Sequence, residues 1–237
     1  MKNADVIVVG AGIIGLSTAW QLHRRGVKHI LVLEKGAGIG EGSTGASSAV
    51  CRHRYSADPM IRLARTGIDA YRGWREFTGL KTPKAEFQND RVLWLTGSDG
   101  GWAQREHARL GELGIATDVL DRQTLAEAFP AINSCTAPVS LDDPDSHACS
   151  SADAHHLLEL DGGYMDPVNA ASDLLHACVN AGIDVRFNSR VTNVSEAGGR
   201  IAGVSLDSGE AFNAEVVVNA AGPWCQPLYA SLGLLPP

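Results

Sequence analysis

Three glycines near the start of the chain have the spacing of a dinucleotide-binding turn. Gly10, Gly12 and Gly15 follow a short apolar run over residues 4–9 and open a helical pattern. Gly10 permits a tight turn, Gly12 lets a pyrophosphate approach the backbone, and Gly15 lets the helix pack closely on the strand. The helix N-terminus also offers free N–H groups and a partial positive charge to phosphates.

An acidic residue completes this motif. The helical pattern over residues 13–25 is followed by an apolar run over 30–33 and then by Glu34. A carboxylate at that position accepts hydrogen bonds from a ribose diol and repels a 2′-phosphate. The strand, helix, strand and acid together predict a site for FAD or NAD rather than for NADP.

A Gly- and Ser-rich stretch, GAGIGEGSTGASS at residues 36–48, comes next. Its backbone N–H groups and hydroxyls can donate to a phosphate or a ribityl chain. Taken alone, such a stretch indicates a flexible loop. Directly after the second strand of a nucleotide-binding unit, it favours a part in cofactor binding.

The elements that must position these residues can be predicted from apolar spacing and turn residues. We predict a helix over 58–77, a hairpin over 86–96, a helix over 101–113, and a short helix over 121–129 that Asp121 caps. Further along the chain, the pattern predicts a helix over 168–181 and then strands over 183–187, 190–194, 200–206, 211–213 and 215–219.

Composition excludes several classes of protein. The chain has 237 residues, 44% of them apolar, and a formal net charge of −7 without a basic run. Nucleic-acid binding is therefore not expected. We also expect no membrane-spanning segment, because no stretch of 18 apolar residues occurs. The N-terminus enters a strand without a cleavable signal pattern, which favours a cytoplasmic protein.

A metal site is not expected either. The five cysteines form an odd set without a C-x-x-C pair, which indicates reduced thiols. His147, Cys149, His155 and His156 lie close together in the sequence, but their spacing matches no zinc pattern. We interpret this segment as a polar surface loop.

Five segments along the chain carry a family resemblance: VIVVGAGIIGLSTAWQL at the start, GEGSTGASSAVCRHRY at 40–55, GGYMDP at 162–167, RVTNV at 190–194 and VVVNAAGPW at 216–224. Together they resemble one family, the FAD-dependent amino-acid and amine oxidoreductases of the D-amino-acid oxidase type, which includes glycine oxidase and sarcosine oxidase. The Arg-His-Arg-Tyr element favours the branch similar to sarcosine oxidase.

This resemblance implies an α/β fold: a Rossmann-type FAD-binding domain, similar to that of glutathione reductase, with an inserted α+β substrate domain. We expect residues 1–84 and 146–237 to form the discontinuous FAD-binding domain. Residues 85–145, which lack the dinucleotide pattern, then form part of the substrate domain.

The resemblance also implies roles for individual residues. Arg52 matches an arginine that helps to bind the substrate carboxylate, although an ordinary structural arginine is the alternative. No catalytic acid or base is implied. The residues implied to hold FAD are Gly10, Gly12, Ile13, Ile14 and Gly15 at the turn, Glu34 and Lys35 at the ribose, Ser43, Thr44, Ser48 and Ala49 in the loop, Val191 at the adenine, and Ala220 and Gly222 at the last strand end.

The implied reaction is oxidation of the C–N bond of an amino acid or N-methyl amino acid by hydride transfer to the flavin. Two alternatives stay open: a non-catalytic or incomplete FAD-binding subunit that needs a partner chain, and a less favoured NAD-dependent dehydrogenase. Because the chain stops at Pro237, soon after VVVNAAGPW, whereas family members continue, we expect the C-terminal part to be missing. Either the chain is then a fragment, or a partner chain completes the site. In a fragment, the unpaired strand edges and apolar surface would favour self-association.

Overall fold

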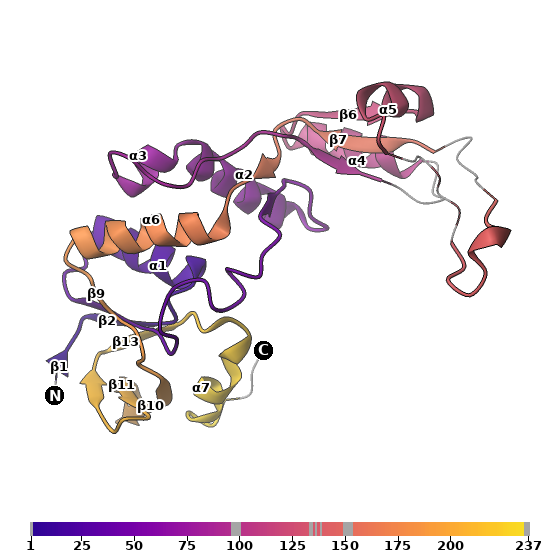
Figure 1. The fold of residues 1–237 in the computed structure, drawn as a ribbon. Helices are drawn as coiled ribbons and strands as arrows, with labels where there is room; N and C mark the ends of the chain where they lie inside the picture. The colour runs from indigo at the N-terminus through magenta and orange to yellow at the C-terminus, as the bar shows by residue number, and fades with distance from the viewer. Residues whose placement is uncertain are drawn as a thin grey trace. The chain divides into compact units, whose positions relative to one another are not determined.

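The computed structural model describes residues 2–95, 101–132, 135, 137, 139–148 and 154–234 (Figure 1). The chain divides into two compact units, and each is described by itself. Unit 1 comprises Met1–Ala49, Gly73–Glu86 and Asp166–Pro237, and unit 2 comprises Val50–Arg72 and Phe87–Met165.

Unit 1 is built on a parallel sheet of four strands in the order β13-β2-β3-β9. Its strands are β2 (Val6–Val9), β3 (Ile30–Leu33), β9 (Asp184–Arg186) and β13 (Val216–Asn219). Every residue of β2 and β3 is buried. This explains their continuous apolar sequence, because a parallel sheet is covered on both faces.

One face of the parallel sheet packs on a second sheet in the order β1-β12-β11-β10. The core between them joins Ile7 and Leu33 to Val204, Phe212 and, from a short helix, Leu228. The strands of the second sheet are β1 (Lys2–Asn3), β10 (Val191–Ala197), β11 (Arg200–Leu206) and β12 (Ala211–Asn213). In the chain, β13 is followed by the 3-10 turn η2 (Gly222–Trp224) and by the short helix α7 (Gln226–Ala230), which contains Leu228.

Helix α1 (Ile13–Arg24) packs on β2, β3 and α6 (Pro167–Asn180), and Figure 1 shows the two helices side by side. Their contact is close enough for the Cys178 thiol to donate to Leu16 O at 3.6 Å. Burial raises the pKa of Cys178 to about 12. This thiol therefore stays protonated at neutral pH and serves the packing of the two helices.

A buried carboxylate fixes the segment 73–86 within unit 1. Asp173 of α6 accepts the indole N–H of Trp74 at 3.0 Å, together with the backbone N–H groups of Lys84 and Ala85, both at 2.9 Å. Trp74 begins α3 (Trp74–Thr78). Three donors thus converge on one side chain that water does not reach.

We expect Asp173→Asn to destabilise unit 1 by about 2 kcal/mol, because an amide has one acceptor oxygen and leaves buried N–H groups unpaired. Urea unfolding followed by tryptophan fluorescence measures this. Asp207→Asn, at an exposed position, is the matched control. An unchanged unfolding midpoint for Asp173→Asn would contradict the role assigned to this carboxylate.

Unit 2 contains an antiparallel sheet in the order β5-β7-β6 and a two-stranded pair, β4 with β8. A hydrophobic cluster that includes Ile61, Leu110 and Leu157 joins the helices to the sheet. The elements are β4 (Val50–Cys51), α2 (Asp58–Arg72), β5 (Val92–Trp94), α4 (Trp102–Glu112), β6 (Thr117–Leu120), α5 (Arg122–Ala128), η1 (Pro144–Ser146), β7 (His156–Glu159) and β8 (Gly163–Tyr164).

Two predictions about the segment 58–96 were wrong. The hairpin over 86–96 does not form, because β5 pairs with β7 and Gln88 pairs with Tyr164. The helix over 58–77 is divided, because α2 ends at Arg72 and α3 begins after Gly73. The Asp121 cap is confirmed, since its carboxylate accepts Thr124 N at 2.8 Å.

The compact units also differ in their bounds from the predicted domains. Residues 50–72 and 154–165 lie in unit 2, because β7 pairs with β5 and β6, and β8 pairs with β4. The assignment of 85–145 to a substrate domain remains a prediction. Among the described residues, no helix is long and apolar enough to cross a membrane.

Candidate functional site

The Gly-rich turn of unit 1 joins β2 to α1 in a conformation that requires glycine. Gly10 has φ +106°, and a Cβ at this position would lie 2.5 Å from Ala220 O. A Cβ on Gly15 would lie 1.9 Å from Gly10 O. Both clashes are with backbone atoms, so a side chain cannot be accommodated by rotation of a neighbour.

The same turn presents a helix N-terminus. Gly12 is the N-cap of α1 and provides no side-chain cap. Ile13 N donates to Thr44 Oγ1 at 3.1 Å, which ties the Gly/Ser loop to the start of the helix. The amides of Ile14 and Gly15 lie in the first turn, where an α-helix supplies no acceptor, and the Ile14 side chain is 68% exposed. These amides can meet a phosphate.

Glu34 follows β3 and links the turn to the loop beyond it. Its two carboxylate oxygens accept Ala11 N and Gly36 N, each at 2.8 Å. The backbone O of Glu34 accepts Ser189 N at 2.8 Å, so the chain that enters β10 at Val191 passes beside Glu34. The structure therefore brings the acid to the Gly-rich turn, as the motif predicts.

The end of β13 closes the other side of the turn. Ala220 N donates to Val9 O at 2.9 Å. The Asn219 side chain accepts Ala221 N at 3.3 Å and donates to Cys225 O at 3.2 Å, which shapes the chain after the strand. Gly222, with φ +58°, begins η2 there.

Trp224, which sequence reasoning missed, lies against the loop. Lys35 Nζ lies 3.4 Å from the centroid of its ring, and a Cβ on Gly42 would lie 3.3 Å from the ring edge. Thr44 is half-buried in this loop. The other predicted loop residues are Ser43 and Ser48, which are exposed, and Ala49, which has φ +65°.

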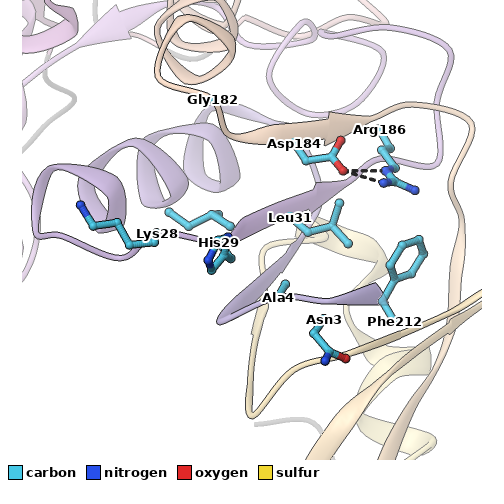
Figure 2. Close-up of a pocket in the computed structure, with 10 residues that line it drawn as sticks. Asn3, Ala4, Lys28, His29, Leu31, Gly182, Asp184, Arg186 and Phe212 are labelled. Carbon is cyan, nitrogen blue, oxygen red and sulfur yellow. Dashed lines mark hydrogen bonds and ion pairs between the residues drawn. The ribbon is translucent and has the colours of Figure 1, made fainter. Parts of the chain in front are cut away.

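A cavity of about 280 Å³ lies at the opposite edge of the sheet (Figure 2). Its lining includes Lys28 and His29, where the chain enters β3, and Gly182 and Asp184, where it enters β9; Arg186, the last residue of β9, also lines it. Arg186 is already paired with Asp184 at 2.6 Å. Ligands of open α/β sheets bind at the carboxyl ends of the strands, so this cavity is not the dinucleotide site.

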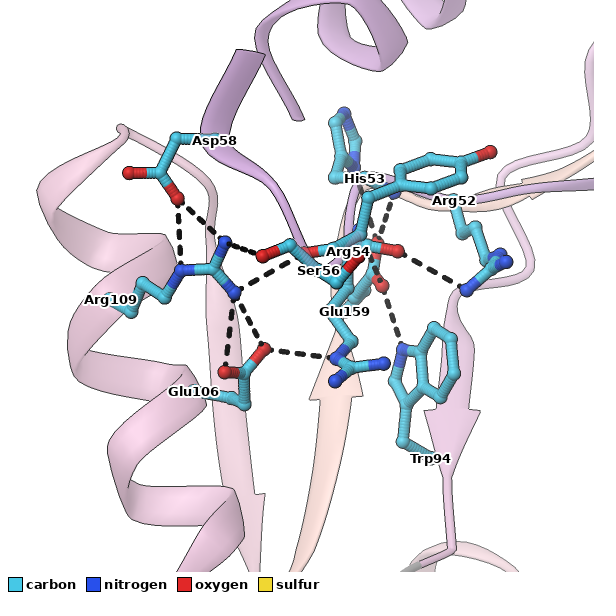
Figure 3. Close-up of polar contacts among 10 residues, drawn as sticks. Arg52, His53, Arg54, Ser56, Asp58, Trp94, Glu106, Arg109 and Glu159 are labelled. Carbon is cyan, nitrogen blue, oxygen red and sulfur yellow. Dashed lines mark hydrogen bonds and ion pairs between the residues drawn. The ribbon is translucent and has the colours of Figure 1, made fainter. Parts of the chain in front are cut away.

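Arg52, in unit 2, lies in an aromatic setting (Figure 3). Its guanidinium carbon is 4.6 Å from the centroid of the Tyr55 ring and 4.9 Å from that of the Trp94 ring. One nitrogen donates to Arg54 O at 3.2 Å. No carboxylate among the described residues lies within ion-pair distance of Arg52, so its charge is available to a ligand.

The histidine-rich segment differs in part from the predicted polar loop. His156 belongs to β7 and is buried, and burial lowers its pKa. His147 Nε2 lies 3.2 Å from Cys135 Sγ, while Cys149 falls outside the described residues. Within the described part of the chain, no three His, Cys, Asp or Glu side chains are placed to hold a metal ion.

Several known proteins are similar to this chain over nearly its whole length. The family DAO, FAD dependent oxidoreductase, matches residues 5–237. Sarcosine oxidase subunit beta of Rhodobacter capsulatus is 27% identical over 93% of this chain and 50% of the relative. The 4-methylaminobutanoate oxidase (formaldehyde-forming) of Paenarthrobacter nicotinovorans is 28% identical over 99% of this chain and 26% of the relative.

Solved structures show the same fold. L-proline dehydrogenase from P. horikoshii superposes with a TM-score of 0.81 at 20% identity, over 98% of this chain and 56% of that protein. The chain thus spans between about a quarter and about half of the length of these proteins. The match covers both the Gly-rich turn and the Arg52 segment, and it does not support the nicotinamide alternative. The chain belongs to the DAO family of FAD-dependent oxidoreductases.

Proposed function

We propose that the chain binds FAD at the carboxyl edge of the β13-β2-β3-β9 sheet and contributes to oxidation of the C–N bond of an N-methyl amino acid. The observation that carries the proposal is the cradle at the Gly-rich turn. Gly10 and Gly15 leave no room for a Cβ, so strand, turn and helix pack closely. A Cβ on Gly12 would meet only Thr44 Oγ1 within 4 Å, so the missing side chain leaves the backbone bare beside the first-turn amides of α1. Such a surface admits a pyrophosphate against the backbone.

The residues around the cradle fit the parts of FAD. Glu34 provides a carboxylate for the ribose diol of the adenosine. Thr44 and Ser43 lie in the loop that would face the pyrophosphate, with Ser48 and Ala49 further along it toward the ribityl chain and the flavin. Val191 would meet the adenine through its backbone. The contact of Ser189 N–H with Glu34, two residues earlier in the chain, supports this assignment.

FAD bound at this site would supply the hydride acceptor for oxidation of the C–N bond, and the imine product would then be hydrolysed by water. The chain's own contribution is orientation. Arg52 would bind the substrate carboxylate through its planar guanidinium. The names of the two relatives, sarcosine oxidase and 4-methylaminobutanoate oxidase, both describe compounds with an N-methylamino group and a carboxylate.

Anaerobic reduction tests this function. The FAD-loaded chain is mixed with sarcosine or with 4-methylaminobutanoate, and the flavin absorbance near its visible maximum is followed. Bleaching by low concentrations of these compounds is the expected result, whereas dimethylamine, which lacks the carboxylate, should bleach the flavin only at far higher concentration. Bound FAD that no amine or amino acid bleaches would reject the catalytic function while leaving FAD binding intact.

Glu34→Gln is expected to weaken FAD binding about 10-fold, because hydrogen bonds to a carboxylate are about twice as strong as those to a neutral amide. The variant should also discriminate less against a 2′-phosphate. Flavin fluorescence titration measures the affinity, and Glu215→Gln, at an exposed position before β13, is the control. An affinity equal to that of the wild type would contradict the role of Glu34.

A second candidate function is that of an FAD-holding subunit within a larger assembly. The observation that favours it is the similarity to a protein whose name describes it as a subunit of sarcosine oxidase. Flavin retention without bleaching, followed by bleaching on addition of a partner chain, would distinguish this function from that of a self-sufficient oxidase.

A further inference from the structure

Arg52 is one member of a stack of alternating rings and guanidinium groups in unit 2. The Trp94 ring lies between two arginines, with its centroid 4.9 Å from the Arg52 guanidinium carbon and 5.0 Å from that of Arg54. Tyr55 covers Arg52 at 4.6 Å, and Trp102 covers Arg54 at 4.8 Å. The direction of the Arg52 side chain therefore depends on where the Trp94 ring is held.

The two arginines of the stack differ in their ion pairs. Arg54 Nε donates to Glu106 at 2.9 Å, and Glu106 also contacts Arg109 at 3.3 Å. Arg109 is paired in addition with Asp58 at 2.6 Å. These acids neutralise Arg54 and Arg109 and leave the charge of Arg52 for a ligand.

The Glu159 carboxylate accepts hydrogen bonds both from the Trp94 ring and from the backbone that follows Arg52 (Figure 3). Its side chain is 0% exposed and accepts the indole N–H of Trp94 at 2.7 Å. It also accepts His53 N at 2.6 Å and Arg54 N at 3.2 Å. Three donors from two distant segments thus converge on the two oxygens of one buried carboxylate.

This environment keeps Glu159 ionised. Burial by itself would raise the pKa of Glu159, but the His53 ring and the N–H groups of His53, Trp94 and Arg54 together hold the pKa below its ordinary value. The His53 ring nitrogen Nδ1 lies 3.4 Å from Glu159 Oε2, within ion-pair distance. A buried carboxylate with this set of donors is a rigid anchor.

We propose that Glu159 is a positioning residue that aims Arg52 at the substrate carboxylate, by fixing the Trp94 ring on which Arg52 lies and the backbone that follows it. The inference rests on the proposed function, in which Arg52 binds that carboxylate. Glu159 touches neither substrate nor cofactor in this account. It acts through Trp94 and the backbone N–H groups of His53 and Arg54.

Glu159→Gln tests the inference in the FAD-loaded protein. The variant is expected to raise KM for sarcosine about 10-fold, which corresponds to about 1.4 kcal/mol, with kcat nearly unchanged. KM for dimethylamine, which has no carboxylate, should not change. Asp161→Asn is the matched control, because Asp161 is an acid of the same unit that pairs with Arg72 and whose side chain is partly exposed. This variant should behave as the wild type.

The Arg52→Met background separates positioning from general structural damage. If Glu159 acts through Arg52, Glu159→Gln adds no further loss for sarcosine in that background. An additive loss, an equal loss for dimethylamine, or an unchanged KM in folded Glu159→Gln would overturn the inference. If Glu159→Gln does not fold, Trp94→Phe, which removes the indole N–H but keeps an aromatic face, is expected to raise KM for sarcosine in the same selective way.

A readout independent of turnover keeps this inference distinct from the proposed function. In the wild type, the side-chain Nε–H resonance of Arg52 is expected to be sharp and to shift on titration with acetate. In Glu159→Gln it should broaden and shift less. If the wild type oxidises no amine, the proposed function fails, whereas equal Arg52 resonances in the two proteins would reject the positioning role.

Discussion

Gly15→Ala is expected to abolish FAD binding. The added Cβ would lie 1.9 Å from Gly10 O and 3.0 Å from Gly10 C, so the clash is with the backbone of the turn itself. Relief requires α1 to move away from β2, which removes the first-turn amides from the place of the pyrophosphate. Flavin fluorescence titration of the variant measures the loss.

Two further variants separate this effect from a general loss of folding. A Cβ on Gly12 would lie 3.1 Å from Thr44 Oγ1, a hydroxyl that can rotate, so Gly12→Ala should fold but bind FAD weakly. Gly111, inside α4, has open space around it, and Gly111→Ala should bind FAD normally. The account of the cradle is contradicted if Gly15→Ala binds FAD as tightly as Gly111→Ala does.

Arg52→Met is expected to raise KM for sarcosine about 100-fold, or about 2.7 kcal/mol, because it removes a charge-assisted pair with the substrate carboxylate. The Arg52 guanidinium has no carboxylate partner among the described residues, and its plane is held between Tyr55 and Trp94. Methionine keeps the length and apolar stem of the side chain. Steady-state kinetics with sarcosine and with dimethylamine measures the difference.

The controls for this prediction come from the same unit. Arg52→Lys keeps the charge but not the planar fork, so its KM should lie between those of the wild type and Arg52→Met. Arg72→Met, at the pair with Asp161, should leave both substrates unaffected. A similar loss for dimethylamine in Arg52→Met would show that Arg52 does not recognise the carboxylate.

The dinucleotide-binding part of the fold could be predicted from the sequence. The strand and helix boundaries around Gly10 and Gly15 agree with the structure to within two residues, and β3 agrees fully. These elements carry local signals: continuous apolar runs, helical spacing and the glycine turn. Glu34 and Thr44 lie at the turn for a related reason, because the fingerprint places an acid at the end of the second strand and the Gly/Ser loop directly after it.

Unit 2 was harder to predict because its pairings join distant segments. The strand β5 has its partner in β7, more than 60 residues later, so adjacent apolar residues over 86–96 suggested a hairpin that does not form. Helix 58–77 was predicted as continuous, since a single internal glycine, Gly73, is a weak signal for a break. The spacing of apolar residues predicts that a segment forms a strand, but it does not indicate which other strand that segment will pair with.

The same limit explains the missed site residues. Glu159 contacts His53 and Arg54 across more than 100 positions and Trp94 across 65. No sequence motif links these residues. Glu159 ends the strand β7 after two leucines, and the pattern of that strand does not predict that its carboxylate binds other residues. The indole of Trp224 could have been suspected from its place in VVVNAAGPW, close to the predicted residue Gly222.

FAD binding at the Gly-rich turn is tested most directly by the visible absorption spectrum of the purified chain, taken with added FAD after gel filtration and again after denaturation. We expect a bound flavin spectrum and release of FAD equimolar with the chain. The claim is contradicted if a well-folded chain, judged by circular dichroism, retains no flavin even after incubation with excess FAD, because the cradle around Gly10, Gly12 and Gly15 would then not be an FAD site.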